Sequence, residues 1–338
     1  MIIDVYDSLN ILSKLTFKKL LNLTLLKLGY WLSVITKKVF VWGNPPFAAI
    51  EPTNFCNLHC PECPTSQLNN SKGIINNTLF ENIINQLSPN LIYLSLYFQG
   101  EPLLHPKLQD LIRFAHQKKI YTSLSTNAQL LNEKNAQQLI SSGLDRIIIS
   151  FDGTTEEIYA LYRKGGSLGK VILAINQLVE QKKKLKLKTP IIILQFVVFK
   201  HNEHQIDEAK LIAKNLKADK IIFKSAQIYH YAQGSNLFTS IKKYNRYKIT
   251  PDGSYKIKSK LPFKCWRAWS SPVITFDGNL LPCCFDKHNQ YKVGTIEDSN
   301  ITDLWKNEKF HQFRNQILTA RNQIDICTNC TEGLVINY

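Results

Sequence analysis

Apolar residues follow two alternating spacings between residues 47 and 224, and this pattern predicts alternating strands and helices. Short runs rich in β-branched and aromatic residues predict the strands. The helical i, i+3, i+4, i+7 spacing predicts a helix after each of the first five strands, as in Phe80, Ile83, Ile84 and Leu87. The predicted strands are residues 47–50, 91–98, 120–125, 144–151, 190–199 and 220–224. The predicted helices are residues 80–87, 108–115, 133–142, 169–184 and 204–216.

This alternation predicts an α/β fold, because parallel strands need crossover connections that helices usually supply. Six strand–helix repeats are countable, fewer than a closed eight-stranded barrel needs. In a fold of this kind the reacting groups lie at the carboxyl ends of the strands. Candidate functional residues are therefore expected at those strand ends.

Residues 8–42 predict one or two leucine-rich helices that carry lysines at positions 14, 18, 19, 27, 37 and 38. Asn22 and Lys27 interrupt the apolar run, so the segment is a poor membrane span. Two interpretations stay open. The segment is a helical cap packed on the barrel, or an interfacial amphipathic segment with Tyr30, Trp31 and Trp42 at the membrane surface.

The C-terminal third predicts a small separate unit. Residues 273–281 predict a β-hairpin with Asp277-Gly278 at its turn, and residues 301–320 predict a helix. Residues 225–262 are weakly patterned and are interpreted as a bridge. The expected domains are residues 1–45 (helical segment), 46–224 (barrel), 225–262 (bridge) and 263–338 (cysteine-rich domain).

Composition narrows the choice of partners and compartment. The chain of 338 residues has a formal net charge of +16, which favours anionic partners. The excess lysine is scattered, however, and no nucleic-acid-binding motif accompanies it, so we expect no specific nucleic acid. Eight cysteines in two groups, without a signal peptide, favour metal ligation in a reducing compartment over disulfides. We expect a cytoplasmic protein, with weak peripheral contact to the inner face of a membrane as an open option.

Cys56, Cys60 and Cys63 form the first cysteine group, directly after the first predicted strand. Three thiolates in one short loop can hold three corners of a cubane iron–sulfur cluster, which leaves one iron open for a small molecule. A zinc knuckle or unrelated buried thiols are the alternative interpretation.

The spacing, the count of three and the preceding strand resemble the signature of the radical S-adenosylmethionine (SAM) enzymes. The resemblance implies an open partial (β/α)6 barrel and a 4Fe-4S cluster that binds SAM. It also implies reductive cleavage of SAM to a 5'-deoxyadenosyl radical that abstracts hydrogen from a substrate. Such an enzyme needs a reducing electron donor such as flavodoxin or ferredoxin.

The same resemblance implies SAM contacts at the strand ends. Gln99-Gly100-Glu101-Pro102 resembles the family's Gly-Gly-Glu-Pro motif, with Gln99 in place of the first glycine. Glu62 stands where the family usually has an aromatic residue. Arg163 resembles an arginine that pairs with the SAM carboxylate. The implied cofactor-binding residues are Gly100, Glu101, Ser125, Asn127, Ser150, Asp152, Arg163 and Gln195.

The second cysteine group resembles the short form of the SPASM extension, often called a twitch domain. The resemblance implies one auxiliary 4Fe-4S cluster on Cys265, Cys283, Cys327 and Cys330. Cys284 then remains as a small buried side chain, or it replaces Cys283 as a ligand. A four-cysteine zinc site is the main alternative.

The predicted function is hydrogen abstraction from a substrate, with a net oxidation of a small sugar-like or aminocyclitol molecule and the auxiliary cluster as electron acceptor. A peptide-modifying maturase and a non-catalytic iron–sulfur or zinc-binding protein are the alternatives. No general base is assigned, although His201, His204, Lys224 and Tyr229 lie near predicted strand ends.

Overall fold

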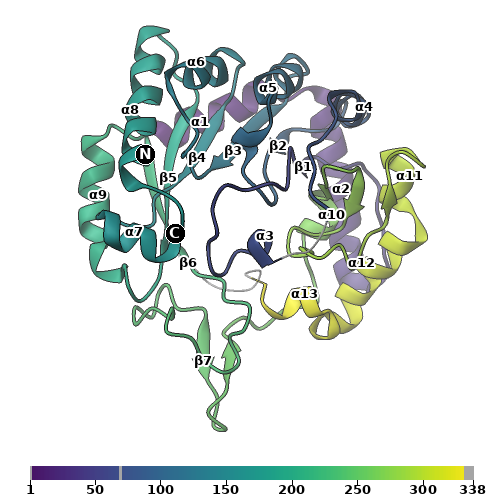
Figure 1. The fold of residues 1–338 in the computed structure, drawn as a ribbon. Coiled ribbons are helices and arrows are strands. Elements are labelled where there is room, and N and C mark those ends of the chain that lie inside the picture. Colours follow the sequence, from purple (N-terminus) through teal and green to yellow (C-terminus); the bar gives the residue numbers. More distant parts are fainter. Residues whose placement is uncertain (1, 68–70, 331–338) are drawn as a thin grey trace.

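The computed structural model describes residues 2–67 and 71–330 of the chain (Figure 1). Within these residues nine strands form one sheet in the order β11-β10-β9-β1-β2-β3-β4-β5-β6, and two more form a separate hairpin, β7-β8. The strands are β1 (Phe47–Ile50), β2 (Tyr93–Ser95), β3 (Tyr121–Thr126), β4 (Arg146–Ser150), β5 (Ile191–Val198), β6 (Lys220–Ser225), β7 (Tyr247–Ile249), β8 (Tyr255–Ile257), β9 (Val273–Ile274), β10 (Asn279–Leu281) and β11 (Gly294–Thr295).

Strands β1 to β6 pair in parallel with their neighbours, and helices cover the outside of the curved sheet (Figure 1). The open, parallel arrangement confirms the predicted α/β partial barrel. The described helices are α1 (Ile2–Ser13), α2 (Phe17–Thr36), α3 (Pro64–Gln67), α4 (Asn77–Leu87), α5 (Leu108–Gln117), α6 (Glu133–Ser141), α7 (Glu156–Tyr162), α8 (Leu168–Lys184), α9 (Ile206–Asn215), α10 (Arg267–Ser270), α11 (Ile301–Lys306), α12 (Glu308–Ala320) and α13 (Asp325–Thr328). Short 3-10 turns span Pro102–Leu104, Glu203–Gln205 and Arg321–Gln323.

Helix α1 closes the end of the barrel where the strands begin. Asp7 accepts hydrogen bonds from Tyr121 and Arg146, the first residues of β3 and β4. Ile3 and Tyr6 pack on an apolar cluster inside that end of the barrel. The opposite end, where the strands finish, is thereby the open end. In the described residues no helix has the length and hydropathy that a membrane span requires.

The predicted hairpin forms, and it joins the barrel sheet. Strands β9 and β10 pair antiparallel around Gly278, which has a positive φ of 78°. Strand β9 also pairs in parallel with β1, with Ala49 opposite Val273. The cysteine-rich segment is therefore joined by backbone hydrogen bonds to the strand that precedes Cys56.

The predicted helix over residues 301–320 is two helices, α11 and α12, that meet at Asn307. The Asn307 side chain accepts a hydrogen bond from the Phe310 amide and so caps the start of α12. Residues 225–262, predicted as an unpatterned bridge, contain the β7-β8 hairpin. Residues 331–338 of the predicted C-terminal domain lie outside the described part of the chain.

Candidate active site

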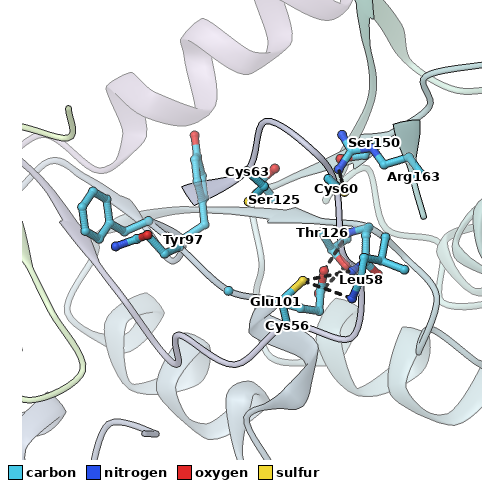
Figure 2. A pocket seen from close by; sticks show the side chains of 14 residues that line it. Cys56, Leu58, Cys60, Cys63, Tyr97, Glu101, Ser125, Thr126, Ser150 and Arg163 are labelled. Atoms are coloured by element: carbon cyan, nitrogen blue, oxygen red, sulfur yellow. Dashed lines mark hydrogen bonds between the residues drawn. The ribbon is translucent and has the colours of Figure 1, made fainter. Parts of the chain in front are cut away.

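The first cysteine group lines a pocket of about 170 Å³ at the open end of the barrel. Cys56, Cys60 and Cys63 lie on the loop that leaves β1, and the loop folds back over the ends of β2, β3 and β4 (Figure 2). The residues that line the pocket are Cys56, Leu58, Cys60, Cys63, Tyr97, Phe98, Gln99, Gly100, Glu101, Ser125, Thr126, Asn127, Ser150 and Arg163. Six of the eight predicted cofactor-binding residues are thus brought together around the three thiols.

Gly100 follows β2 at a point where no side chain fits. Its φ is +70°, and a Cβ there would lie 2.4 Å from the Thr53 carbonyl oxygen and 2.6 Å from that of Phe55. The close approach joins the loop after β2 to the segment that precedes Cys56. The second glycine of the family motif is therefore required by the packing of the two loops that form the pocket.

The Glu101 carboxylate holds β2 and β3 together at the pocket. Its two oxygens accept hydrogen bonds from the Thr126 hydroxyl at 2.6 Å and the Asn127 amide at 2.7 Å, and a third from the Leu103 amide at 3.1 Å. Burial raises the pKa of Glu101, while these donors oppose that rise. Because these three donors already bind the Glu101 carboxylate, mainly the backbone of Glu101 remains available to a ligand.

Asn127 reaches from the end of β3 to the cysteine loop. Its side-chain amide donates to the Asn57 side chain at 2.9 Å and lies 4.0 Å from the Cys56 sulfur. Ser125 and Ser150 line the pocket from β3 and β4. The strand ends therefore supply neutral hydrogen-bonding groups next to the thiols, as expected for a polar cofactor.

Arg163 lies between the cysteine loop and a buried carboxylate. Its guanidinium pairs with Asp152 at 2.5 Å, and its Nη1 lies 3.8 Å from the Cys60 sulfur. Asp152 is fully buried and also accepts a hydrogen bond from the Val197 amide at 2.6 Å. The pair fixes one cation against the thiols at the edge of the pocket.

Two predicted cofactor neighbours lie just beyond the pocket lining. Asp152 contacts Arg163 rather than the pocket, and Gln195 lies on β5 opposite Ser150. The candidate bases His201, His204, Lys224 and Tyr229 do not line this pocket either. Asp152 is therefore a positioning residue for Arg163, and direct SAM contacts of Asp152 and Gln195 stay predictions.

Glu62, a departure from the family pattern, makes a long-range contact. Its carboxylate accepts a hydrogen bond at 3.0 Å from the backbone amide of Tyr229, in the segment after β6. This contact fastens the cysteine loop to the bridge between the two cysteine groups. The only sign of this contact in the sequence was a glutamate at a position where the family usually has an aromatic residue. Its partner, Tyr229, was not predictable from the sequence.

Three residues that sequence reasoning missed lie beside the pocket: Glu51, Tyr97 and Lys287. Burial raises the pKa of Glu51 to about 7 and lowers the pKa of Lys287. Burial also raises the pKa of Tyr97, which lines the pocket from the residues after β2. Lys287 extends from the segment after Cys283 to the Phe98 carbonyl oxygen, which it contacts at 3.0 Å.

The second cysteine group lines another cavity, a small one of about 10 Å³. Cys265, Cys283, Cys327 and Cys330 all face it and are all buried, whereas Cys284 is not among its lining residues. Cys284 instead packs against an apolar cluster that contains Ala49 and Val273. The four predicted cysteines thus face one cavity and the fifth lies outside it, while their role as cluster ligands stays a prediction.

Arg321 supports this four-cysteine cavity. It is completely buried, donates to the Lys264 carbonyl oxygen at 2.6 Å, and lies 3.8 Å from the Cys330 sulfur. Burial raises the pKa of Cys327, while Arg321 opposes that rise. A buried cation beside four sulfur atoms suits a group with thiolate ligands, because it offsets their negative charge.

The donor set of each site fits a cubane cluster. In such a cluster each thiolate binds a different iron, so the sulfur atoms need not converge on one point. Among residues 2–67 and 71–330, no three Cys, His, Asp or Glu side chains converge closely enough for a single metal ion. The first site offers three thiols beside polar strand ends, and the second offers four thiols in an apolar cavity.

Comparison with known proteins supports this assignment. A model of the radical SAM superfamily matches residues 50–211, and a model of the SPASM iron–sulfur cluster-binding domain matches residues 265–331. The tungsten-containing aldehyde ferredoxin oxidoreductase cofactor-modifying protein of Pyrococcus furiosus is 25% identical over 314 residues, 83% of this chain and 86% of that protein.

Two solved structures share the fold. BtrN in complex with AdoMet and 2-DOIA matches with a TM-score of 0.52 at 19% identity, over 85% of this chain and 92% of that chain. Streptococcus suis SuiB bound to S-adenosylmethionine matches with a TM-score of 0.65 at 16% identity, over 88% of this chain and 74% of that chain. The cofactors are SAM, a SAM-binding 4Fe-4S cluster and an auxiliary 4Fe-4S cluster. The chain belongs to the radical SAM superfamily of enzymes and carries a C-terminal SPASM domain.

Proposed function

We propose that this enzyme oxidises a small sugar-like or aminocyclitol molecule by two electrons, in a dehydrogenation. The observation that carries the proposal is the four-thiol cavity downstream of the SAM pocket. A two-electron oxidation needs an acceptor for its second electron, and a buried cluster close to the barrel is suitable. Of the eight cysteines, only Cys284 is left over, so one auxiliary cluster is proposed rather than two.

The residues of the first pocket have assigned roles in this proposal. Cys56, Cys60 and Cys63 hold the cluster that, when bound, supplies the electron for SAM cleavage to a 5'-deoxyadenosyl radical. Arg163 pairs with the SAM carboxylate, and Asp152 fixes the guanidinium in place. The backbone at Gly100 and Glu101 and the side chains of Ser125, Asn127, Ser150 and Gln195 complete the proposed SAM site.

The proposed oxidation removes two hydrogen atoms from an alcohol, in separate steps. An alcohol carbon loses a hydrogen atom to the 5'-deoxyadenosyl radical, which becomes 5'-deoxyadenosine. The hydroxyl then loses a proton and the carbon radical loses one electron, so that a carbonyl group forms. Cys265, Cys283, Cys327 and Cys330 hold the cluster that accepts this electron.

The proposed partners follow from this chemistry. A flavodoxin or ferredoxin supplies the first electron, because SAM cleavage consumes one reducing equivalent. The proposed compartment is the cytoplasm, because the thiols required for two clusters persist best in a reducing environment. A peptide substrate is the second candidate. The chain carries a SPASM domain, and its fold is similar to that of SuiB bound to its precursor peptide.

Substrate screening under anaerobic conditions tests the proposal. The reconstituted protein is incubated with SAM and dithionite, and with 2-DOIA, related aminocyclitols or short peptides. We expect an aminocyclitol to stimulate 5'-deoxyadenosine release and to give a product lighter by two hydrogen atoms. Stimulation and modification of peptides alone would replace this proposal with the maturase function.

A further inference from the structure

The inner side of helix α2 is mixed, with Leu26 and Tyr30 buried beside polar residues, whereas its outer side is largely apolar. Lys19, Asn22 and Ser33 are buried on its inner side. On its outer side Phe17 is 82% exposed and Ile35 is 76% exposed. A surface helix usually presents polar residues to the solvent, so an apolar outer side is unusual.

Five exposed apolar residues lie on one side of α2, with Thr24 between Leu21 and Leu28. We define the α2 apolar face as Phe17, Leu21, Leu28, Trp31 and Ile35, which recur at spacings of three, four and seven residues. Such spacings place them along one side of a helix. Single exposed apolar residues are ordinary, whereas five of them on one side of a helix indicate a binding surface.

Hydrogen bonds on the inner side fix this orientation. The Lys19 ammonium donates to the Lys119 carbonyl oxygen at 2.6 Å, and burial lowers the Lys19 pKa to about 8. The Asn22 side chain exchanges two hydrogen bonds with the backbone of Asn44, at 2.8 and 2.9 Å. Rotation of α2 to bury its apolar face would break these bonds and leave buried polar groups unpaired.

The charged residues on and next to α2 in the sequence have one sign. Lys18, Lys27, Lys37 and Lys38 are exposed on or beside α2. Residues 8–50 contain no aspartate or glutamate. The ammonium of Lys264 lies 5.7 Å from the centre of the half-exposed Trp31 ring, so a cation and an indole border the face together. Lysines and an indole beside an apolar stripe are typical of helices that lie in a membrane interface.

We propose that α2 docks the protein onto an anionic lipid bilayer, with the helix lying in the plane of the surface. The apolar face enters the headgroup boundary, while the lysines contact lipid phosphates. A second copy of the chain is a poorer occupant, because a symmetric contact would bring lysines of both copies together. This proposal is independent of the proposed reaction, because it rests on residues outside the SAM pocket.

Vesicle flotation tests the docking surface with the full, cluster-loaded protein. The probes are vesicles of phosphatidylcholine alone and of phosphatidylcholine mixed with phosphatidylglycerol, at low and high salt. The test variant is Leu21→Gln/Leu28→Gln/Ile35→Gln, which changes exposed residues only. The matched control is Leu173→Gln/Leu211→Gln, which changes equally exposed leucines on α8 and α9.

We expect the wild type and the control to float with the anionic vesicles at low salt, and high salt to weaken this binding. The triple variant should lose at least about tenfold in partitioning while its 5'-deoxyadenosine release is unchanged. Three results would each overturn the proposal: no flotation of the wild type, equal flotation of the triple variant, or a wild-type dimer that the triple variant converts to a monomer. The last result would assign the α2 apolar face to a second copy.

Discussion

Gln99 and Lys287 connect the SAM pocket to the cysteine-rich segment. The Gln99 side-chain amide donates to the Lys287 carbonyl oxygen at 3.0 Å. In return, the Lys287 ammonium donates to the Phe98 carbonyl oxygen at 3.0 Å and lies 3.8 Å from the centre of the Phe98 ring. The residue that replaces a family glycine therefore ties the pocket loop to the segment that follows Cys283.

This contact predicts the effect of Gln99→Ala. Loss of a neutral hydrogen bond should lower the free energy of unfolding by about 0.5–1.5 kcal/mol. SAM affinity should change little, because Gly100 and the backbone of the loop remain. Denaturant unfolding and SAM titration measure the two effects. An unfolding free energy equal to that of the wild type would show that the contact does not stabilise the folded chain.

Arg163→Ala should weaken SAM binding by about 1.5–3 kcal/mol, because a charge-assisted pair with the SAM carboxylate is lost. It should also destabilise the fold, since Asp152 then lies buried without its cation. Isothermal titration of the cluster-loaded protein with SAM measures the first effect.

The variant Arg163→Ala/Asp152→Asn separates the two effects. The amide that replaces the carboxylate carries no charge, so this double variant should regain stability relative to Arg163→Ala. SAM binding should stay weak, because the guanidinium is still missing. If the double variant regained normal SAM affinity, Arg163 would act only by balancing the charge of Asp152.

Cys327→Ala and Cys284→Ala form a matched pair of thiol removals. Cys327 faces the four-thiol cavity, whereas Cys284 packs outside it. Cys327→Ala should spare SAM cleavage but stop product formation and lower the iron content by up to half. Cys284→Ala should be mild in both assays. Normal turnover by a folded Cys327 variant that lacks the second cluster would contradict the role of that cluster as electron acceptor.

Glu51 predicts a pH dependence of stability. Burial raises the pKa of its carboxyl from 4.5 to about 7, so the folded chain holds this proton more tightly than the unfolded chain. The associated stabilisation is complete below about pH 4.5 and is lost as the pH rises through about 7, at up to about 1.4 kcal/mol per pH unit.

The variant Glu51→Gln should remove this pH dependence. The difference in unfolding free energy between the wild type and Glu51→Gln cancels contributions that both proteins share. Measured from about pH 5 to about pH 8, the difference should move steadily in favour of the variant as the pH rises. A difference that is constant across this range would contradict a raised pKa at Glu51.

The barrel was predictable because its signals are local. Each parallel strand is an apolar run of a few residues, and each covering helix shows its own periodicity, as with Phe80 and Ile84 on α4. The cysteine spacing likewise identified the loop that lines the pocket. The break at Asn307 also had local signals, since asparagine is a favoured N-cap residue and the step of five from Trp305 to Phe310 departs from helical spacing.

Other features depend on partners far away in the sequence. The pairing of β9 with β1 is a long-range contact, and a strand of two residues is too short to predict its pairing partner from the sequence. The roles of Glu62 and Gln99 appear only when Tyr229 and Lys287 are placed beside them. The outward apolar face of α2 was equally hidden, because the periodicity of a helix does not say which side packs on the protein.

We assign the cluster that cleaves SAM to Cys56, Cys60 and Cys63. The most direct measurement is 5'-deoxyadenosine release by the anaerobically reconstituted protein with SAM and dithionite. The wild type should bind about eight irons and release 5'-deoxyadenosine. The variant Cys56→Ala/Cys60→Ala/Cys63→Ala should keep about half of the iron and release none. Release by this variant, or no release by a fully loaded and reduced wild type, would contradict the assignment of the three cysteines.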